Sequence, residues 1–281
     1  MRDAHLIEYE DGSMYYLYYN PEKHSYESSD DGKEWEKVPS VTRIIDSCFP
    51  KYLTDWAVQE GADFFLKSIE PYRLAPTEAV GTFMLPAKVV DHIFKGIQSA
   101  SKIISTQAAE VGETVHEWIS DGIRWKLEYL KNPPKLPHDD ESINCINAFK
   151  KWVSGKDITF HTTEEKIYYH DDNTVLRFAG TADAVASIGG TRYVIDFKTS
   201  KKIYKPYYLQ VAAYCKAIDK IYGGKSIGII LRLDKERGEY QEKVFDPEPH
   251  DEIFDYCLRL KNWNSIRIKF ETSLEIKGPD T

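Results

Sequence analysis

The chain has 281 residues, of which 42% are hydrophobic and 13% are aromatic. A chain of this length can bury a sizeable core, and its composition excludes wholesale disorder. The sequence lacks any run of about 18 apolar residues, so it predicts no membrane-spanning helix. The formal net charge of −8 is unfavourable for a nucleic-acid-binding protein, because contacts to phosphate require cations.

The N-terminal residues and the cysteines indicate where the protein works. Residues 1–11 lack an apolar signal core and are too acidic for a transit peptide, so we expect a cytoplasmic protein. The four cysteines lie far apart and include no C-x-x-C pair, which favours unpaired structural thiols at Cys48, Cys145, Cys215 and Cys257.

Residues 5–40 predict a group of short strands that ends at Ser40, a residue that fits the N-cap of the next helix. Their aromatic run, Tyr15 to Tyr19, is expected to pack the sheet, with base stacking as the alternative. Residues 51–100 look helical, with one break around Pro71 to Pro76.

Residues 103–128 form the clearest predicted helix, because apolar side chains recur along them at steps of three and four residues. His116 lies beside this apolar stripe, where a lone histidine is usually a core or boundary residue. Gly112 lies one turn earlier and would let a sheet approach the helix closely. A proline-containing connector at 131–137 then leads to a second amphipathic helix at 139–153.

A strand is predicted at Ile158 to Tyr169, and it contains two adjacent acids. Alternation of side chains puts Glu165 on the face of the apolar Ile167. Glu164 lies on the opposite face, with Lys166. We therefore expect Glu165 to point to the apolar side, where an acid needs a functional reason. An ordinary exposed glutamate is the alternative.

The two segments that follow predict neighbouring strands, joined by a turn at Gly189-Gly190. Asp183 lies on the first strand, and Asp196 and Lys198 share one face of the second. If the turn brings the aspartates together, they repel by roughly 3–4 kcal/mol at an effective dielectric near 20. A lysine can offset this repulsion, but a divalent cation with oxygen ligands suits the pair better. A surface ion pair between Asp196 and Lys198 is the alternative.

A further helix is predicted around Gln210 and Tyr214, which lie one turn apart on one face. The stretch from Lys198 to Lys225 contains seven lysines and one acid, so positive charge gathers there. Beyond it the sequence predicts two strands and a closing helix, at Ser226 to Leu233, Glu239 to Phe245 and Pro249 to Ile266.

Three motifs in this region carry a resemblance to a known family: Gly180-Thr181-Ala182-Asp183, Asp196-Phe197-Lys198-Thr199-Ser200-Lys201, and Gln210 with Tyr214. Over residues 105–235 the sequence resembles the RecB-like branch of the PD-(D/E)XK nucleases, which includes phage and bacterial exonucleases and mitochondrial genome maintenance exonucleases. Asp183 matches the aspartate of the PD element, although Ala182 replaces the proline. The combined motifs are specific, whereas each one alone is weak.

The resemblance implies a set of site residues. Catalytic roles are implied for Asp183, Asp196, Lys198, Glu165, Gln210 and Tyr214, the last two holding Lys198 and the phosphate in register. One or two Mg²⁺ or Mn²⁺ ions are expected, held by His116, Glu165, Asp183, Asp196 and the backbone carbonyl of Phe197. DNA contacts are expected from the nearby Lys201, Lys202 and Lys205. Relatives with an iron–sulfur cluster carry closely spaced cysteines after the helical motif; this chain has only Cys215 and Cys257 there, so no cluster is expected.

The expected fold is α/β, a PD-(D/E)XK (restriction-endonuclease-like) core with a mixed central sheet flanked by helices. Residues 1–100 would add strands and helices that help enclose DNA, residues 101–247 would form the nuclease core, and residues 248–281 a C-terminal helix and tail. The expected activity is metal-dependent exonuclease cleavage of DNA that is single-stranded or has a free end. The resemblance connects it with phage or bacterial DNA recombination, repair or degradation.

Two alternatives stay open at this point. A non-catalytic nucleic-acid-binding scaffold of the same fold would bind DNA without metal-dependent cleavage. A sequence- or structure-specific endonuclease would also cut covalently closed circles. The resemblance leaves room for a helicase or recombinase partner, in the cytoplasm of a bacterium or of a phage-infected host.

Overall fold

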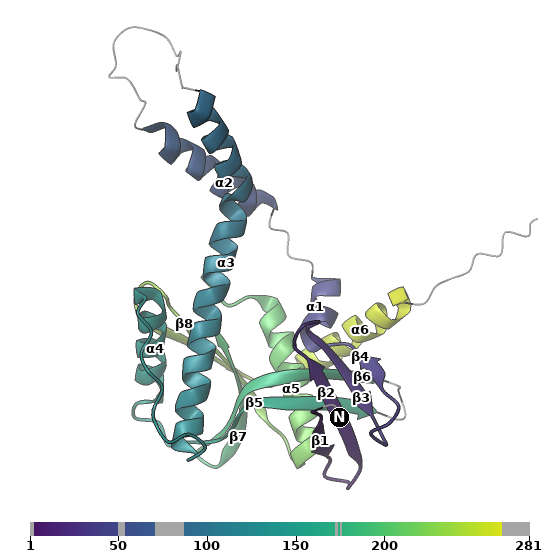
Figure 1. The fold of residues 1–281 in the computed structure, drawn as a ribbon. Coiled ribbons are helices and arrows are strands. Elements are labelled where there is room, and N and C mark those ends of the chain that lie inside the picture. Colours follow the sequence, from purple (N-terminus) through teal and green to yellow (C-terminus); the bar gives the residue numbers. More distant parts are fainter. Residues whose placement is uncertain (1–2, 50–53, 71–86, 172–173, 175, 266–281) are drawn as a thin grey trace, which may run out of the picture.

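The computed structural model describes residues 3–49, 54–70, 87–171, 174 and 176–265. In these residues the chain forms a mixed α/β fold with two sheets (Figure 1). None of the described helices is both long enough and apolar enough to cross a membrane. The helix break predicted around Pro71 to Pro76 lies outside the described residues, and so does the part of the predicted C-terminal segment after Ser265.

The N-terminal strands form an antiparallel sheet in chain order: β1 (His5–Glu8), β2 (Met14–Asn20), β3 (Ser25–Ser29) and β4 (Glu36–Val38). Helix α1 (Val41–Cys48) follows, and Ser40 caps it as predicted, since its Oγ accepts a hydrogen bond from the Arg43 N–H at 3.3 Å. Tyr15 packs edge-on against Tyr168 of the second sheet, with 5.3 Å between ring centroids. Aromatic packing by Tyr15 therefore joins the two sheets.

The second sheet also follows chain order: β5 (Ile158–Asp171), β6 (Leu176–Ile188), β7 (Thr191–Lys198), β8 (Ile227–Leu233) and β9 (Tyr240–Phe245). Neighbouring strands are antiparallel except β7 and β8, which are parallel and are connected through α5 (Lys205–Tyr222). A crossover helix is the usual connection between parallel strands. Within the described residues, each strand and helix predicted from residue 139 onwards forms, and those predicted at 139–153, 158–169, 226–233 and 239–245 end within two residues of their predicted bounds.

Helices cover both faces of this second sheet (Figure 1). Helices α1, α5 and α6 (Glu248–Ser265) share one core cluster with Val194 of β7. Helices α3 (Ala87–Lys126) and α4 (Asp140–Val153) share the other with Ile195 and Phe197. Strand β7 is thus buried on both faces, and Asp196 lies in the interior with 0% of its surface exposed.

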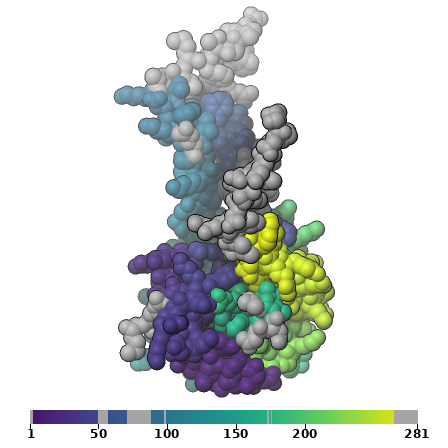
Figure 2. Space-filling view, turned by 90° about the vertical axis from the view of Figure 1, so that its right-hand side faces the viewer, coloured from purple at the N-terminus to yellow at the C-terminus, as the bar shows by residue number. Residues whose placement is uncertain are grey.

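Helix α3 is a single helix of 40 residues, so it extends for about 60 Å. Its C-terminal half packs on the second sheet, while its N-terminal half projects from the body together with α2 (Thr54–Ile69) (Figures 1 and 2). The two helices approach at glycines: a Cβ on Gly61 would lie 3.1 Å from Ile97, and one on Gly96 would lie 2.0 Å from the Phe64 ring. The domain boundary predicted between residues 100 and 101 falls inside α3.

Candidate metal centre

The β6–β7 hairpin sets the register of the two predicted aspartates. Its turn consists of Gly189 and Gly190, with φ angles of 57° and 81°. Positive φ at both positions is typical of the tight turns that match the twist of a hairpin, and glycine adopts it without steric cost. The ladder runs from this turn to the Ala184–Ile195 pair, so the next two residues in register are Asp183 and Asp196.

The hairpin ladder ends at these two aspartates. In place of a backbone carbonyl of β6, the Oδ2 atom of Asp183 accepts a hydrogen bond from the Phe197 N–H at 2.8 Å. On the other side, the Thr163 hydroxyl donates to the backbone carbonyl of Asp183 at 2.8 Å. These two bonds fix Asp183 between β5 and β7, close enough to Asp196 for the two charges to interact.

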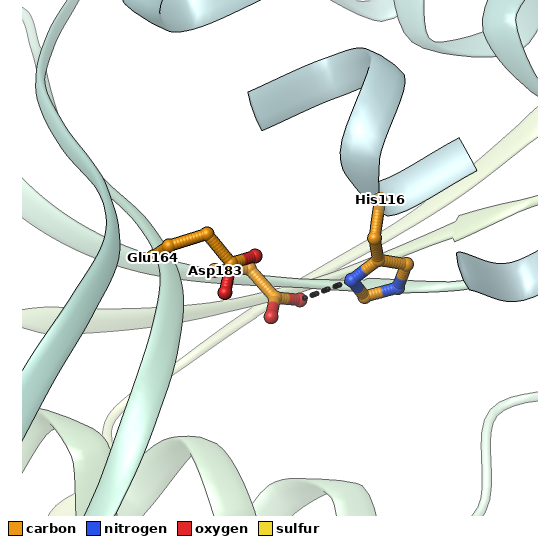
Figure 3. Close-up of side chains that lie close together, drawn as sticks. All are labelled: His116, Glu164 and Asp183. Carbon is orange, nitrogen blue, oxygen red and sulfur yellow. Dashed lines mark ion pairs between the residues drawn. The ribbon is translucent and has the colours of Figure 1, made fainter. Parts of the chain in front are cut away.

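Three side chains from three elements meet at this point (Figure 3). The potential ligand atoms of His116 on α3, Glu164 on β5 and Asp183 on β6 all lie within 4.8 Å of one another. The Nδ1 atom of His116 is 3.4 Å from Oδ2 of Asp183. An imidazole nitrogen and two carboxylates form a donor set that fits a divalent metal ion.

The surroundings of His116 fix its ring and its charge. The Phe197 ring packs edge-on against it, with 6.1 Å between centroids. Burial alone would lower the pKa of His116, but the charge and hydrogen bond of Asp183 raise it. Gly112 lets the helix approach the residue that follows β7, since a Cβ there would lie 3.3 Å from the Thr199 hydroxyl. With 29% of its side chain exposed, His116 fits a ligand better than a core residue.

The structure corrects the choice between the two glutamates of β5. The Glu165 carboxylate lies outside the cluster, where it accepts hydrogen bonds from the hydroxyls of Tyr222 at 2.9 Å and Thr162 at 2.6 Å. Glu164 is the member of the cluster, because the β5–β6 register places it opposite Asp183. Residues opposite each other in an antiparallel pair share a face. The register between β5 and β6 therefore identifies Glu164 as the residue that faces Asp183. The position of the apolar side chains on β5 does not identify it.

Glu164 also has an unusual backbone conformation. Its φ of 53° lies in the left-handed region, which is uncommon outside glycine and costs on the order of 1–3 kcal/mol. Burial, together with the charge of Asp183, raises the pKa of the Glu164 carboxyl. Backbone strain and a disfavoured charge at one residue are typical of functional sites, where a bound cation can offset both.

Asp196 and Lys198 lie next to the cluster and contact each other, with 2.5 Å between Lys198 Nζ and Asp196 Oδ2. Burial raises the pKa of Asp196 to about 6, although the charge of Lys198 opposes this. Burial would lower the pKa of Lys198, but the charges of Asp196 and Asp183 raise it. In the described part of the chain, Oδ1 of Asp196 has no hydrogen-bond donor. A buried acceptor without a donor fits a metal ligand.

The predicted helical motif lies on α5 and supports β6. Gln210 Nε2 donates a hydrogen bond to the Tyr214 hydroxyl at 3.0 Å. The Tyr214 ring contacts the backbone of Gly180, where a Cβ would lie only 2.8 Å from the ring. Gly180 comes three residues before Asp183, so the first and third sequence motifs touch. The sequence motifs do not predict the aromatic neighbour of Lys198, which is Tyr207 with its ring centroid 4.9 Å from Nζ.

Lys201 and Lys202 lie in the connection between β7 and α5, and Lys205 is the first residue of α5. Lys201, Lys202 and Lys205 are exposed, and Lys202 Nζ lies 5.3 Å from the centroid of the Tyr204 ring. Their charges are therefore accessible to an anionic partner. DNA binding by these lysines and metal ligation by the Phe197 carbonyl stay predictions.

Comparisons with known proteins give little further information. No family model matches the chain, and no curated protein matches it. Among solved structures the chain is similar to the crystal structure of SSO0001, with 19% sequence identity and a TM-score of 0.28. The match covers 46% of this chain and 62% of that one, less than two thirds of its length. A similarity this weak carries no argument about the site.

Proposed function

We propose that this protein is a divalent-metal-dependent phosphodiester hydrolase. The observation that carries the proposal is the meeting of His116, Glu164 and Asp183 beside the buried Asp196–Lys198 pair. Carboxylate and imidazole ligands can hold Mg²⁺ or Mn²⁺, and an ammonium beside them can contact a phosphate. Within this class, the activity that fits best is a DNA exonuclease of the PD-(D/E)XK type, in agreement with the three sequence motifs.

The ligands available for one or two ions are His116, Glu164, Asp183 and Asp196. When bound, such an ion lowers the pKa of a bound water and stabilises the leaving oxygen. Since imidazole is a softer ligand than oxygen, Mn²⁺ should serve at least as well as Mg²⁺.

The residues of the chain orient the reactants in this proposal. Hydrolysis forms a bond from a water oxygen to phosphorus and breaks the bond from phosphorus to a sugar oxygen; the attacking water gives up a proton to solvent, and the departing sugar oxygen takes one from solvent. Lys198 keeps its proton, because the neighbouring Asp196 and Asp183 raise its pKa. It therefore donates hydrogen bonds to the phosphate or to the attacking water, and offsets the negative charge that develops.

The test is digestion of end-labelled single-stranded, duplex and covalently closed circular DNA in Mn²⁺. We expect loss of the linear substrates and survival of the circles. Matched variants are Asp196→Asn, which removes a ligand charge, and Lys198→Gln, which removes the ammonium. Both should lose detectable cleavage, while Lys198→Gln should still bind Mn²⁺.

Each other outcome selects a different function. Cutting of closed circles would indicate an endonuclease. Binding of DNA without cleavage of any substrate would indicate the non-catalytic scaffold. Cleavage by Lys198→Gln at a rate near that of the wild type would exclude a mechanism in which the Lys198 ammonium stabilises the developing charge.

A further inference from the structure

Lys166 lies beside the candidate metal centre but is not one of its candidate ligands. It is on β5, two residues after Glu164, so the two side chains leave the strand on the same side about 7 Å apart. The Nζ atom donates a hydrogen bond to the Thr181 hydroxyl at 2.9 Å. It also lies 5.1 Å from the centroid of the Tyr19 ring on β2. Lys166 is thus held where the N-terminal sheet meets β5 and β6 (Figure 1).

The groups around Lys166 form a fixed support. The Tyr26 hydroxyl shares a hydrogen bond with Thr181 at 2.8 Å. The rings of Tyr26 and Tyr19 pack with 4.9 Å between centroids. Because both sheets contribute to this support, the ammonium is positioned before any ligand arrives, which lowers the entropy cost of binding.

Glu164 is an acid whose charge acts on Lys166, but the two do not form an ion pair in direct contact. Two other partly buried lysines have one: Lys216 lies 2.7 Å from Asp255, and Lys156 lies 3.0 Å from Glu242. Within the described residues, no carboxylate oxygen comes within the 4.0 Å of an ion pair with Lys166. Apart from the charge of Glu164, the direct partners of this partly buried ammonium are a hydroxyl and a ring, and an anion in contact with it would complete the arrangement.

We propose that Lys166 binds the phosphate that neighbours the one being cut. This inference rests on the proposed function, since the anion is a phosphate of the same nucleic-acid strand whose scissile phosphate lies at the metal cluster. The strand then leaves the centre over the junction with the N-terminal sheet. That sheet contributes to substrate binding by holding Lys166 in place, through the Tyr19 ring and through the hydrogen bond between Tyr26 and Thr181.

The experiment measures binding of a fluorescent single-stranded oligonucleotide by anisotropy, with Ca²⁺ in place of Mn²⁺. The variant Lys166→Gln should bind about tenfold more weakly, as for a lost hydrogen bond to a charged group. The slope of log affinity against log salt should become shallower by about 0.7, the value for one phosphate contact on a single strand. Lys166→Arg keeps the charge and should bind close to wild type.

A matched control is Lys220→Gln. Lys220 also lies over a tyrosine ring, with 5.2 Å from its Nζ to the Tyr9 centroid. It is ten residues beyond Gln210 on α5, about 15 Å along the helix. This variant should show unchanged affinity and salt slope.

A second measurement places the contact on the DNA. Oligonucleotides with a single neutral methylphosphonate at successive positions should show one internal position that weakens binding to the wild type. The same position should have no effect on Lys166→Gln, because the contact is already lost. This readout uses the folded wild type as well as the variant, so it does not depend on the stability of Lys166→Gln.

The results separate the two proposals. If the wild type cuts DNA while Lys166→Gln shows wild-type affinity and salt slope, the phosphate contact is wrong and the nuclease function stands. The proposed phosphate contact is also wrong if each methylphosphonate position changes the binding affinity of Lys166→Gln and of the wild type by the same factor. If the wild type neither binds nor cuts DNA, both proposals are wrong.

Discussion

At the scale of single residues, the candidate centre holds more negative than positive charge. Glu164, Asp183 and Asp196 supply three carboxyls, against the ammonium of Lys198 and the imidazole of His116. Burial adds to the cost of each charge, which is why the pKa values of Glu164 and Asp196 are raised. A bound divalent cation would balance this excess.

The two adjacent glutamates give a matched test of the centre. Glu164→Gln should lower the affinity for Mn²⁺ at least about tenfold, because it removes a charged ligand. Glu165→Gln should leave the affinity unchanged, since its carboxylate lies against Tyr222. Isothermal titration calorimetry on both variants measures this difference. The reverse order of effects would restore the sequence-based choice of Glu165.

The affinity for Mn²⁺ should also depend on pH. The pKa of Asp196 is raised to about 6 by burial, and the pKa of His116 is raised by Asp183. Below its pKa each group carries a proton that the metal must displace. The affinity should therefore begin to fall as the pH drops below the raised pKa of His116, and fall more steeply below about 6, where Asp196 takes up a proton. Each displaced proton contributes about a tenfold loss per pH unit. Calorimetric titrations of the wild type between pH 5 and pH 8 measure this dependence, and Glu165→Gln serves as the control that should show the same profile. An affinity for Mn²⁺ that does not change with pH would contradict the ligand set.

At the scale of secondary-structure elements, most of the fold was predictable from the sequence. Alternation in β7 and the Gly189-Gly190 turn predict two strands with Asp183 beside Asp196, and the ladder register agrees. The same alternation failed on β5, because it says which side chains share a face but not which face meets the site. That choice depends on the register between β5 and β6, which is set by contacts far apart in the sequence.

Contacts that cross between elements were likewise beyond the reach of the sequence. The motifs around Gly180 and Tyr214 are each visible in the chain, yet only the structure shows that they touch. The same holds for Lys198 over Tyr207 and for Lys166 over Tyr19, because each pair joins segments whose packing no local pattern encodes.

The contact between β6 and α5 gives a prediction about stability. In Gly180→Ala the new Cβ would lie 2.8 Å from the Tyr214 ring, so the ring or the strand must move. We expect a loss of about 1–3 kcal/mol in the free energy of unfolding, typical of overpacking. Urea denaturation measures it. In the Tyr214→Leu background the same substitution should cost less; equal costs in both backgrounds would mean that the ring is not the obstacle.

At the scale of the whole molecule, the candidate ligands come from both layers of the fold. His116 belongs to α3, which packs on one face of the second sheet, while Glu164 and Asp183 belong to the sheet itself. A metal bound to all three would therefore hold helix and sheet together, in addition to the apolar packing of Val115 and Ile119 of α3 against the sheet.

This coupling predicts that metal stabilises the folded protein. A ligand at a hundred times its dissociation constant adds about 2.7 kcal/mol, which should raise the melting temperature by on the order of 5 °C. Differential scanning calorimetry with and without Mn²⁺ measures the shift. At the same Mn²⁺ concentration His116→Ala should show a much smaller shift, and Glu165→Gln should behave as wild type. A full shift in His116→Ala would mean that α3 takes no part in binding.

The hairpin between the two aspartates has a consequence for how this region can evolve. Asp183 comes six residues before Gly189, and Asp196 comes six residues after Gly190, so the turn is the midpoint between them. Their meeting depends on equal spacing, not on the identity of most residues in between. Gain or loss of one codon in the β7 arm would turn Asp196 and Lys198 to the opposite face, and Ile195 and Phe197 toward the site, whereas the same change in the β6 arm would turn Asp183 away. Point substitutions in the arms can be absorbed one at a time, whereas a single-residue insertion or deletion would remove the centre in one step.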